Sequence, residues 1–328
     1  MIITRTPYRV SFMGGGTDYR QWYEEHGGAV LSTTIDRYCY ILARRMPAFL
    51  GTRYRIFYAK SECVNELAEI QHPAVRAALQ HVGMDEGFEL NHAGDLPARS
   101  GLGSSSAFTV GVLHALHALQ GRHVTKPELA AQAVHLEQDV MRETVGLQDQ
   151  VACAYGGLNL IEIDRGGRWA VHPVVMTEER RALFQAHCML YFTGIQRHAS
   201  GFAAAQIASL ADRSAQMKEI AALVRECLTV LTGPGDLAEF GRALREGWEL
   251  KKSLSPMIST PWIDELYGLA RGAGALGGKL LGAGGGGFLL LFVRPEDQPR
   301  VRLAMDGQAI EAPFEFETGG SRIVYSEG

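Results

Sequence analysis

The stretch DLPARSGLGSSSAFTVG, residues 95–111, changes abruptly from glycine and serine to apolar residues. From Phe108 onward, apolar residues recur at helical spacing, which predicts a helix that begins at the serines and ends near Gly121. The first backbone N–H groups of a helix lack partners inside the helix and carry the positive end of its dipole. The stretch therefore predicts a phosphate cradle, and a helix merely capped by Ser104 is the alternative.

Two more glycine-rich loops lie next to apolar segments, FMGGGTDY at residues 12–19 and LGAGGGGF at residues 281–288. Glycine lets a backbone approach a ligand closely and adopt positive φ. Two other glycine patterns do not qualify as nucleotide sites. GAGALG, residues 272–277, follows a predicted helix and precedes a strand, the reverse of a dinucleotide fingerprint. Residues 277–279, Gly-Gly-Lys, lack both the earlier glycine and the Ser/Thr of a Walker A loop.

Two carboxylates occupy apolar settings. The helical neighbours of Glu137 are Ala133, Val134, Val140 and Met141, and those of Asp149 include Ala152 and Cys153. Because a buried carboxylate needs a cation or several donors, these residues suggest a metal ligand and a base. A pair of structural acids, satisfied by arginines, is an equal alternative. A phosphate cradle, a metal carboxylate and a base together indicate an ATP-dependent kinase without a Walker A loop.

The composition is that of an ordinary globular protein, with 328 residues, 46% hydrophobic and 21% charged residues and a net charge of −4. Lys/Arg blocks and long apolar runs are missing, so we expect neither a nucleic-acid nor a membrane partner. The five dispersed cysteines without a CxxC motif favour reduced thiols, and the first residues read as a strand rather than a signal peptide. A cytoplasmic protein, monomeric or homodimeric, is the resulting expectation.

Strands and helices are mixed without regular βαβ alternation, which favours an α+β fold. The connection DRGGRW, residues 164–169, is the sparsest in apolar residues. We therefore predict two domains, residues 1–168 and residues 169–328.

Three motifs resemble those of the GHMP kinase family in the family's order. They are RTPYRVSFMGGGTDY, LPARSGLGSSSA and KLLGAGGGGF, which together span residues 5–288. The resemblance implies an N-terminal domain like domain 2 of ribosomal protein S5, a ferredoxin-like C-terminal domain, and an active site between them that uses ATP and Mg²⁺.

Carried over by position, the resemblance also implies roles for individual residues. Asp149 would be the base, with Arg9 beside it, and Ser105 would bind Mg²⁺ together with Glu137. The ATP phosphates would be wrapped by Gly101, Leu102, Gly103, Ser104, Ser105 and Ser106. The acceptor would be contacted by Gly15, Gly16, Thr17 and Asp18 of the first motif and by Gly284 and Gly285 of the third. Arg197 is a further candidate that does not come from the resemblance.

Within the family, the Gly-Gly-Gly-Thr-Asp form of the first motif is similar to D-glycero-D-manno-heptose 7-phosphate kinases of bacterial capsule and surface-polysaccharide pathways. It departs from galactokinases, which carry Glu-His where Gly15 and Gly16 stand. A sugar phosphate needs a second cationic pocket, for which Arg20, Arg99, Arg197 and Lys279 are candidates. Arg197 is favoured because it follows a strand end. A kinase for mannose or fucose, and a non-catalytic sugar sensor, are the alternatives.

Overall fold

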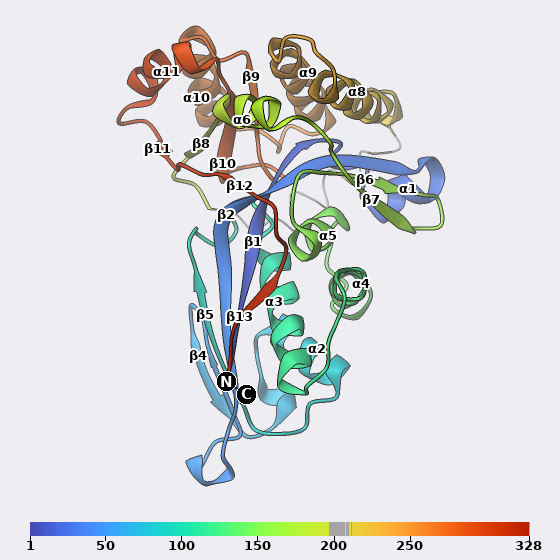
Figure 1. Cartoon of the computed structure of the whole chain (residues 1–328), viewed down its shortest axis with the longest axis vertical. Coiled ribbons are helices and arrows are strands. Elements are labelled where there is room, and N and C mark those ends of the chain that lie inside the picture. Colours follow the sequence, from blue (N-terminus) through green and yellow to red (C-terminus); the bar gives the residue numbers. More distant parts are fainter. Residues whose placement is uncertain (197–206, 208–209, 211, 328) are drawn as a thin grey trace.

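The computed structural model describes residues 1–196, 207, 210 and 212–327 of the chain. It contains two sheets with helices packed on them, which confirms the predicted α+β class. In Figure 1 the two sheets lie at opposite ends of the long axis, and β1 (Ile2–Met13) and β2 (Gly28–Arg45) run from one end toward the other. No helix in the described ranges combines the length and the hydropathy that crossing a bilayer requires.

The larger sheet has nine strands, and its main path runs β13–β1–β2–β5–β3–β4. All its pairs are antiparallel except β3 with β5. Its other strands are β3 (Tyr54–Phe57), β4 (Ser61–Val64), β5 (Phe88–Gly94), β6 (Asn159–Ile163), β7 (Trp169–Pro173), β12 (Phe316–Glu317) and β13 (Arg322–Ser326). One face of it is covered by α2 (Pro73–Val82), α3 (Ser104–Leu119), α4 (Lys126–His135) and α5 (Gln148–Tyr155) (Figure 1).

The smaller sheet has four antiparallel strands in the order β11–β8–β10–β9. They are β8 (Cys188–Phe192), β9 (Gly277–Leu280), β10 (Phe288–Phe292) and β11 (Ile310–Glu311). Around it lie α6 (Glu178–Ala186), α8 (Ser214–Thr232), α9 (Ala238–Leu254), α10 (Pro261–Gly272) and α11 (Gln298–Met305). A cluster of phenylalanine rings, among them Phe12 and Phe184 at 5.2 Å, joins the two parts of the molecule through β1 and α6.

The helix predicted to begin at the serines is present as α3, Ser104–Leu119. A capping box of Thr125 and Glu128 starts α4, which ends at His135 and continues as one π-helical segment, Leu136–Val140. The helix α8 begins at Ser214.

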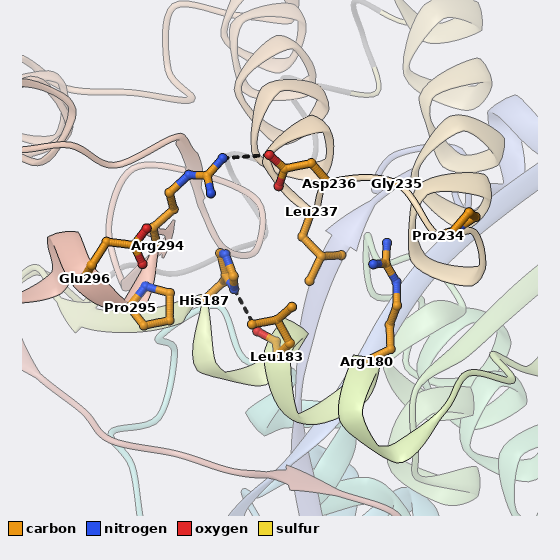
Figure 2. A pocket seen from close by; sticks show the side chains of 10 residues that line it. All are labelled: Arg180, Leu183, His187, Pro234, Gly235, Asp236, Leu237, Arg294, Pro295 and Glu296. Atoms are coloured by element: carbon orange, nitrogen blue, oxygen red, sulfur yellow. Dashed lines mark hydrogen bonds and ion pairs between the residues drawn. The ribbon is translucent and has the colours of Figure 1, made fainter.

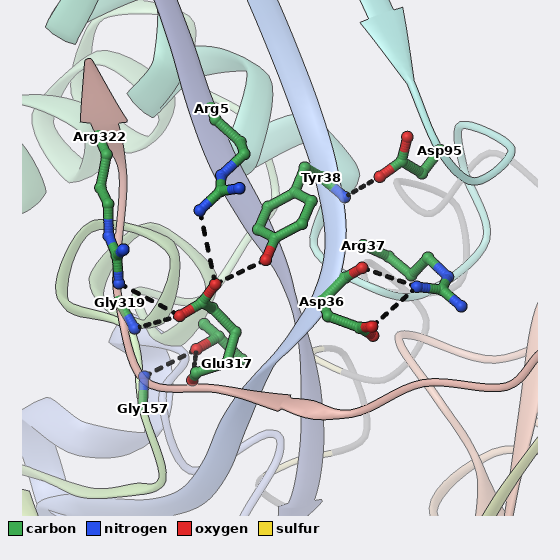
Figure 3. Close-up of polar contacts among 10 residues, drawn as sticks. Arg5, Asp36, Arg37, Tyr38, Asp95, Gly157, Glu317, Gly319 and Arg322 are labelled. Atoms are coloured by element: carbon green, nitrogen blue, oxygen red, sulfur yellow. Dashed lines mark hydrogen bonds and ion pairs between the residues drawn. The ribbon is translucent and has the colours of Figure 1, made fainter. Parts of the chain in front are cut away.

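The chain end returns to the larger sheet, where β12 pairs with β2 and β13 with β1. Figure 3 shows the polar contacts that secure this return around Glu317. Its carboxylate accepts hydrogen bonds from the Tyr38 hydroxyl at 2.6 Å, from the Gly319 amide at 2.7 Å and from Arg322 at 3.2 Å. The predicted boundary between residues 168 and 169 also falls inside the β6–β7 hairpin. We therefore propose a division in which β7, β12 and β13 belong with the first domain.

Candidate active site

The serine loop leads directly into α3, as its sequence predicts. Gly103 occupies the N-cap position with φ 71°, a left-handed conformation that suits glycine, and no side chain among the described residues caps the helix. The alternative of a helix capped by Ser104 is therefore wrong, because Ser104 is the first helical residue and its hydroxyl accepts from the Arg99 amide at 3.2 Å. The first-turn N–H groups of α3 remain available for an anion.

The third glycine loop, between β9 and β10, packs against the backbone of the second. A Cβ on Gly101 would stand 2.3 Å from the Leu281 carbonyl oxygen, and one on Gly287 would stand 2.3 Å from the Ser100 carbonyl oxygen. The Phe288 amide donates to that same Ser100 carbonyl at 3.1 Å. The third loop thus supports the phosphate loop by backbone contact that side chains at these positions would prevent.

Arg9 and Asp149 contact each other beside the serine loop, residues 100–106. Arg9 is 3% exposed, and its Nε and Nη2 donate to the two carboxylate oxygens of Asp149 at 2.7 and 2.8 Å. Its Nη1 donates to the Gly101 carbonyl at 2.8 Å. A Cβ on Gly103 would lie 3.4 Å from Asp149 Oδ2, so the carboxylate stands directly beside the start of α3. Asp149, the predicted base, is therefore in contact with Arg9, its predicted neighbour. The same contact is also what the alternative predicts, in which Asp149 is a structural acid paired with an arginine.

Glu137 is fully buried at the other side of the α3 N-terminus. Its Oε2 accepts from the Ser106 hydroxyl at 2.9 Å and from the Gln150 amide, and its buried Oε1 has no hydrogen-bond partner among the residues that the structure describes. Burial raises the pKa of Glu137 to about 7. The structure brings Ser106, not Ser105, to this carboxylate, because Ser105 points to the exposed side of the first turn.

A buried, unpartnered carboxylate oxygen beside a serine hydroxyl fits a hard cation such as Mg²⁺. No cluster of three or more His, Cys, Asp or Glu side chains in the described ranges could hold a metal ion alone. Mg²⁺ is commonly bound by one or two carboxylates together with substrate phosphates, which is the donor set that Glu137 and Ser106 would complete.

The first glycine loop is shaped around Asp18, whose carboxylate is buried. Its Oδ1 accepts from the Gly16 amide at 2.9 Å and its Oδ2 from the Gln148 amide at 3.3 Å, while burial raises the pKa of Asp18. Thr17 was expected to bind the acceptor, and the structure corrects this. Its buried hydroxyl donates to the Gly14 carbonyl at 2.8 Å and accepts from the Ala29 amide at 3.1 Å, so it closes the loop instead.

The two glycines of the third loop that were predicted to contact the acceptor pack against another segment of the chain. Gly284 and Gly285 pack on Ile258, with the Gly285 amide donating to the Ile258 carbonyl at 3.0 Å. Arg197 lies outside the described residues. Arg20 pairs with Asp139 at 2.9 Å on the exposed side of α1 (Arg20–His26).

Two buried lysines lie beside the first and third glycine loops, and only one of them, Lys279, was among the predicted cations. Lys279, a predicted candidate, donates to the Phe12 carbonyl at 3.1 Å, and Lys251 of α9 donates to the Gly282 carbonyl. The pKa of Lys251 is lowered to about 8, first by burial and then by Arg9. The sequence pattern does not indicate that Lys251 is buried, because a lysine in the last turn of a helix is ordinarily exposed to solvent, where it interacts with the helix dipole.

A pocket of about 380 Å³ lies elsewhere, between α6, the α8–α9 connection and the start of the short helix Pro295–Asp297 (Figure 2). Arg294 at its rim pairs with Asp236 at 2.7 Å, and His187 shares a hydrogen bond with the Leu183 carbonyl at 2.7 Å. The described residues that line it come from none of the three glycine loops, so this pocket is separate from the carboxylates.

Two family models match the chain in order. The GHMP kinases N terminal domain matches residues 67–157, and the GHMP kinases C terminal domain matches residues 217–311. The D-glycero-alpha-D-manno-heptose 7-phosphate kinase of Campylobacter jejuni is 29% identical over 90% of this chain and 90% of its own. The L-fucokinase/L-fucose-1-P guanylyltransferase of Bacteroides fragilis is 26% identical over 91% of this chain, which spans 35% of that protein.

A solved structure has the same fold. The D-glycero-D-manno-heptose 1-phosphate kinase from Bacteroides thetaiotaomicron superposes over 100% of both chains with a TM-score of 0.82 at 24% identity. Both domain models of one family match in sequence order, and this fold covers the whole chain. The chain therefore belongs to the GHMP kinase family and is an ATP-dependent phosphotransferase.

Proposed function

We propose that this kinase acts on a sugar and transfers the γ-phosphate of ATP to the anomeric hydroxyl of D-glycero-D-manno-heptose 7-phosphate, giving the 1,7-bisphosphate. The observation that carries the reaction type is the Arg9–Asp149 pair beside the uncapped N-terminus of α3. The similarity to a heptose 7-phosphate kinase over 90% of both chains supports the substrate class. The product would serve nucleotide-heptose and surface-polysaccharide synthesis, in the cytoplasm and as a monomer or homodimer.

In this mechanism the chain positions groups more than it performs covalent chemistry. The α3 N-terminus and the Ser104–Ser106 hydroxyls bind the phosphates of ATP, and Glu137 with Ser106 would hold Mg²⁺. ATP would supply the phosphoryl group and leave as ADP, and a bound Mg²⁺ would neutralise part of the charge on the phosphate oxygens. Asp149 accepts the proton of the acceptor hydroxyl, and Arg9 holds the carboxylate in place. An anomeric hydroxyl is more acidic than an ordinary alcohol, so a carboxylate is an adequate base.

The first loop would receive the sugar. Gly15 and Gly16 leave room for the ring, and Asp18 holds the loop through the amides of Gly16 and Gln148. A second candidate function is a fucose- or mannose-type kinase, because the chain also matches a fucokinase over 91% of its length.

The test is an ATP-consumption screen with heptose 7-phosphate, heptose, mannose and fucose, followed by ³¹P NMR of the product. We expect the highest kcat/KM for heptose 7-phosphate and a new anomeric phosphate resonance. Equal or higher kcat/KM for a neutral sugar contradicts the substrate, and a product phosphorylated away from C1 contradicts the position.

A further inference from the structure

Lys251 and Lys279 are two buried ammonium groups beside the first glycine loop. Each residue is 7% exposed, although one comes from α9 and the other from β9. Within the described part of the chain, each has one hydrogen-bond acceptor, a neutral backbone carbonyl, and neither has an ion pair with a carboxylate. The two lysines therefore place two amino groups in the interior with no acidic partner among the described residues.

Such an arrangement is costly for a structural role. A lysine ammonium has three donors, and burying it with one neutral acceptor leaves desolvation largely uncompensated. The two lysines also repel each other, since Lys251 is the second cause, after burial, of the lowered pKa of Lys279. Replacing a poorly compensated buried charge by an apolar side chain is often neutral or stabilising. Two such residues at one place point to a ligand that supplies the missing negative charge.

Their location connects them to the acceptor side of the site. Both line a cavity with Gly14 and Gly15, walled by Met13 and by apolar side chains of α8 and α9. Lys251 also lies within electrostatic reach of Asp18 and Asp149, which favour its charged form, and of Arg9, which disfavours it. The cavity of about 10 Å³ has room for about one water molecule, so a phosphate group would have to bind outside it, within reach of the lysine side chains.

Two other cations, Arg20 and Lys252, already have acidic partners. Arg20 is already paired with Asp139 and half exposed. The neighbouring Lys252 contacts Glu249 at 3.0 Å and Asp264 at 3.4 Å, so acids already balance its charge. A compact ammonium on a flexible four-carbon stem is well suited to a phosphate, because it can turn toward the anion without a fixed geometry.

We propose that Lys251 and Lys279 form the subsite that binds the phosphate group already carried by the acceptor, with its sugar ring lying over Gly15. Lys251 is the contacting residue nearest the base, and Lys279 adds positive potential behind it. This subsite rests on the proposed function, since a neutral sugar would not need it. It would make the lysines determinants of specificity for a phosphorylated over an unphosphorylated sugar.

The experiment compares Lys251→Met and Lys279→Met with Lys252→Met as the matched control on the same helix. Each variant is assayed with heptose 7-phosphate and with unphosphorylated heptose. We expect the KM for heptose 7-phosphate to rise about tenfold to a hundredfold in the first two variants, as for a lost hydrogen bond to a charged group. For unphosphorylated heptose we expect a change of less than about threefold. Lys252→Met should behave as wild type with both sugars.

The outcomes separate this subsite from the proposed function. If the wild type does not phosphorylate heptose 7-phosphate, the proposed function fails, and calorimetric titration with inorganic phosphate decides the subsite alone. The subsite is supported if the wild type binds phosphate and Lys251→Met does not. It is overturned if Lys251→Met binds phosphate as the wild type does, or if the wild type does not bind phosphate. If the wild type is active, an equal loss of kcat/KM for both sugars overturns it. Lys279→Gln replaces Lys279→Met if the latter does not fold by circular dichroism.

Discussion

Arg9 and Asp149 contact each other through two parallel hydrogen bonds of 2.7 and 2.8 Å, and the third donor of the same guanidinium reaches the Gly101 carbonyl. Fork-shaped pairing of this kind fixes orientation as well as distance. The carboxylate is therefore held relative to the phosphate-loop backbone before any substrate binds. This link between β1, α5 and the second loop is the geometric basis of the base assignment.

Replacing the base should separate binding from turnover. We expect Asp149→Asn to retain ATP binding while kcat falls about a hundredfold or more, the usual range for a lost general base. The amide keeps the shape of the side chain but does not accept the proton. Calorimetric titration with ATP and a coupled assay of ADP release measure the two quantities. Asp139→Asn, an exposed acid paired with Arg20, is the control. Unchanged turnover of Asp149→Asn rules out this residue as the base.

Replacing Arg9 by lysine should lower kcat. Arg9→Lys keeps the positive charge but loses the forked contact with Asp149 and the bond to Gly101. We expect kcat to fall by about tenfold to a hundredfold with little change in the affinity for ATP. Arg5→Lys, on the same strand and partly exposed, provides the comparison. Wild-type kcat in Arg9→Lys shows that charge alone suffices and that orientation does not matter.

The metal requirement depends on Glu137. Glu137→Gln preserves an acceptor for the Ser106 hydroxyl but removes the negative charge. We expect the Mg²⁺ concentration for half-maximal rate to rise about tenfold or more, since ligand charge is a large part of Mg²⁺ affinity. Initial rates against free Mg²⁺ at saturating ATP measure this. Glu162→Gln, on the exposed face of β6, is the control. A normal Mg²⁺ dependence removes Glu137 from the metal site.

Substitution by alanine should affect stability at Gly101 but not at Gly15. Gly101 has φ 83° and its Cβ would stand 2.3 Å from the Leu281 carbonyl oxygen, so Gly101→Ala should lower both Tm and activity. At Gly15 the nearest atoms to a Cβ are 3.8 Å away, so Gly15→Ala should fold with the Tm of the wild type. We expect its KM for the sugar to rise if the ring lies over Gly15. Melting curves and sugar titrations test both, and a wild-type KM in Gly15→Ala places the sugar elsewhere.

Much of this site follows from local sequence signals. Helical spacing after Gly103 and the apolar neighbours of Glu137 and Asp149 indicate α3 and the inward carboxylates, because helix periodicity depends on nearby residues. The choice between Ser105 and Ser106 does not follow, since it depends on the rotation of α3 against α4 and α5. The sequence has three consecutive serines after Gly103, and it does not show which of them faces Glu137.

The long-range features could not be predicted in the same way. The pairing of β12 with β2 joins residues far apart in sequence, and the two-residue strand Phe316–Glu317 has no periodicity of its own. Lys251 sits at the buried side of a helix whose last turn carries two adjacent lysines, so the pattern does not say which one faces the interior. Burial of this kind is decided by the packing of α9 on β9 and the third loop.

The buried ammonium of Lys251 should make the protein less stable than its apolar variant, in a pH-dependent manner. The pKa of Lys251 is lowered from 10.5 to about 8 in the fold, so below pH 8 the charged group destabilises the folded state by an amount on the order of 3 kcal/mol. Between about pH 8 and 10.5 the folded protein releases this proton while the unfolded chain keeps it, and the penalty disappears as the pH rises. Lys251→Met should therefore have a higher Tm than the wild type at pH 7, with a difference that shrinks toward pH 10. The lost bond to the Gly282 carbonyl offsets about 1 kcal/mol of the gain. Thermal melts of Lys251→Met, the wild type and Lys252→Met at several pH values measure this. A lower Tm for Lys251→Met at every pH means that the ammonium stabilises the fold, and that its place beside the first loop is structural.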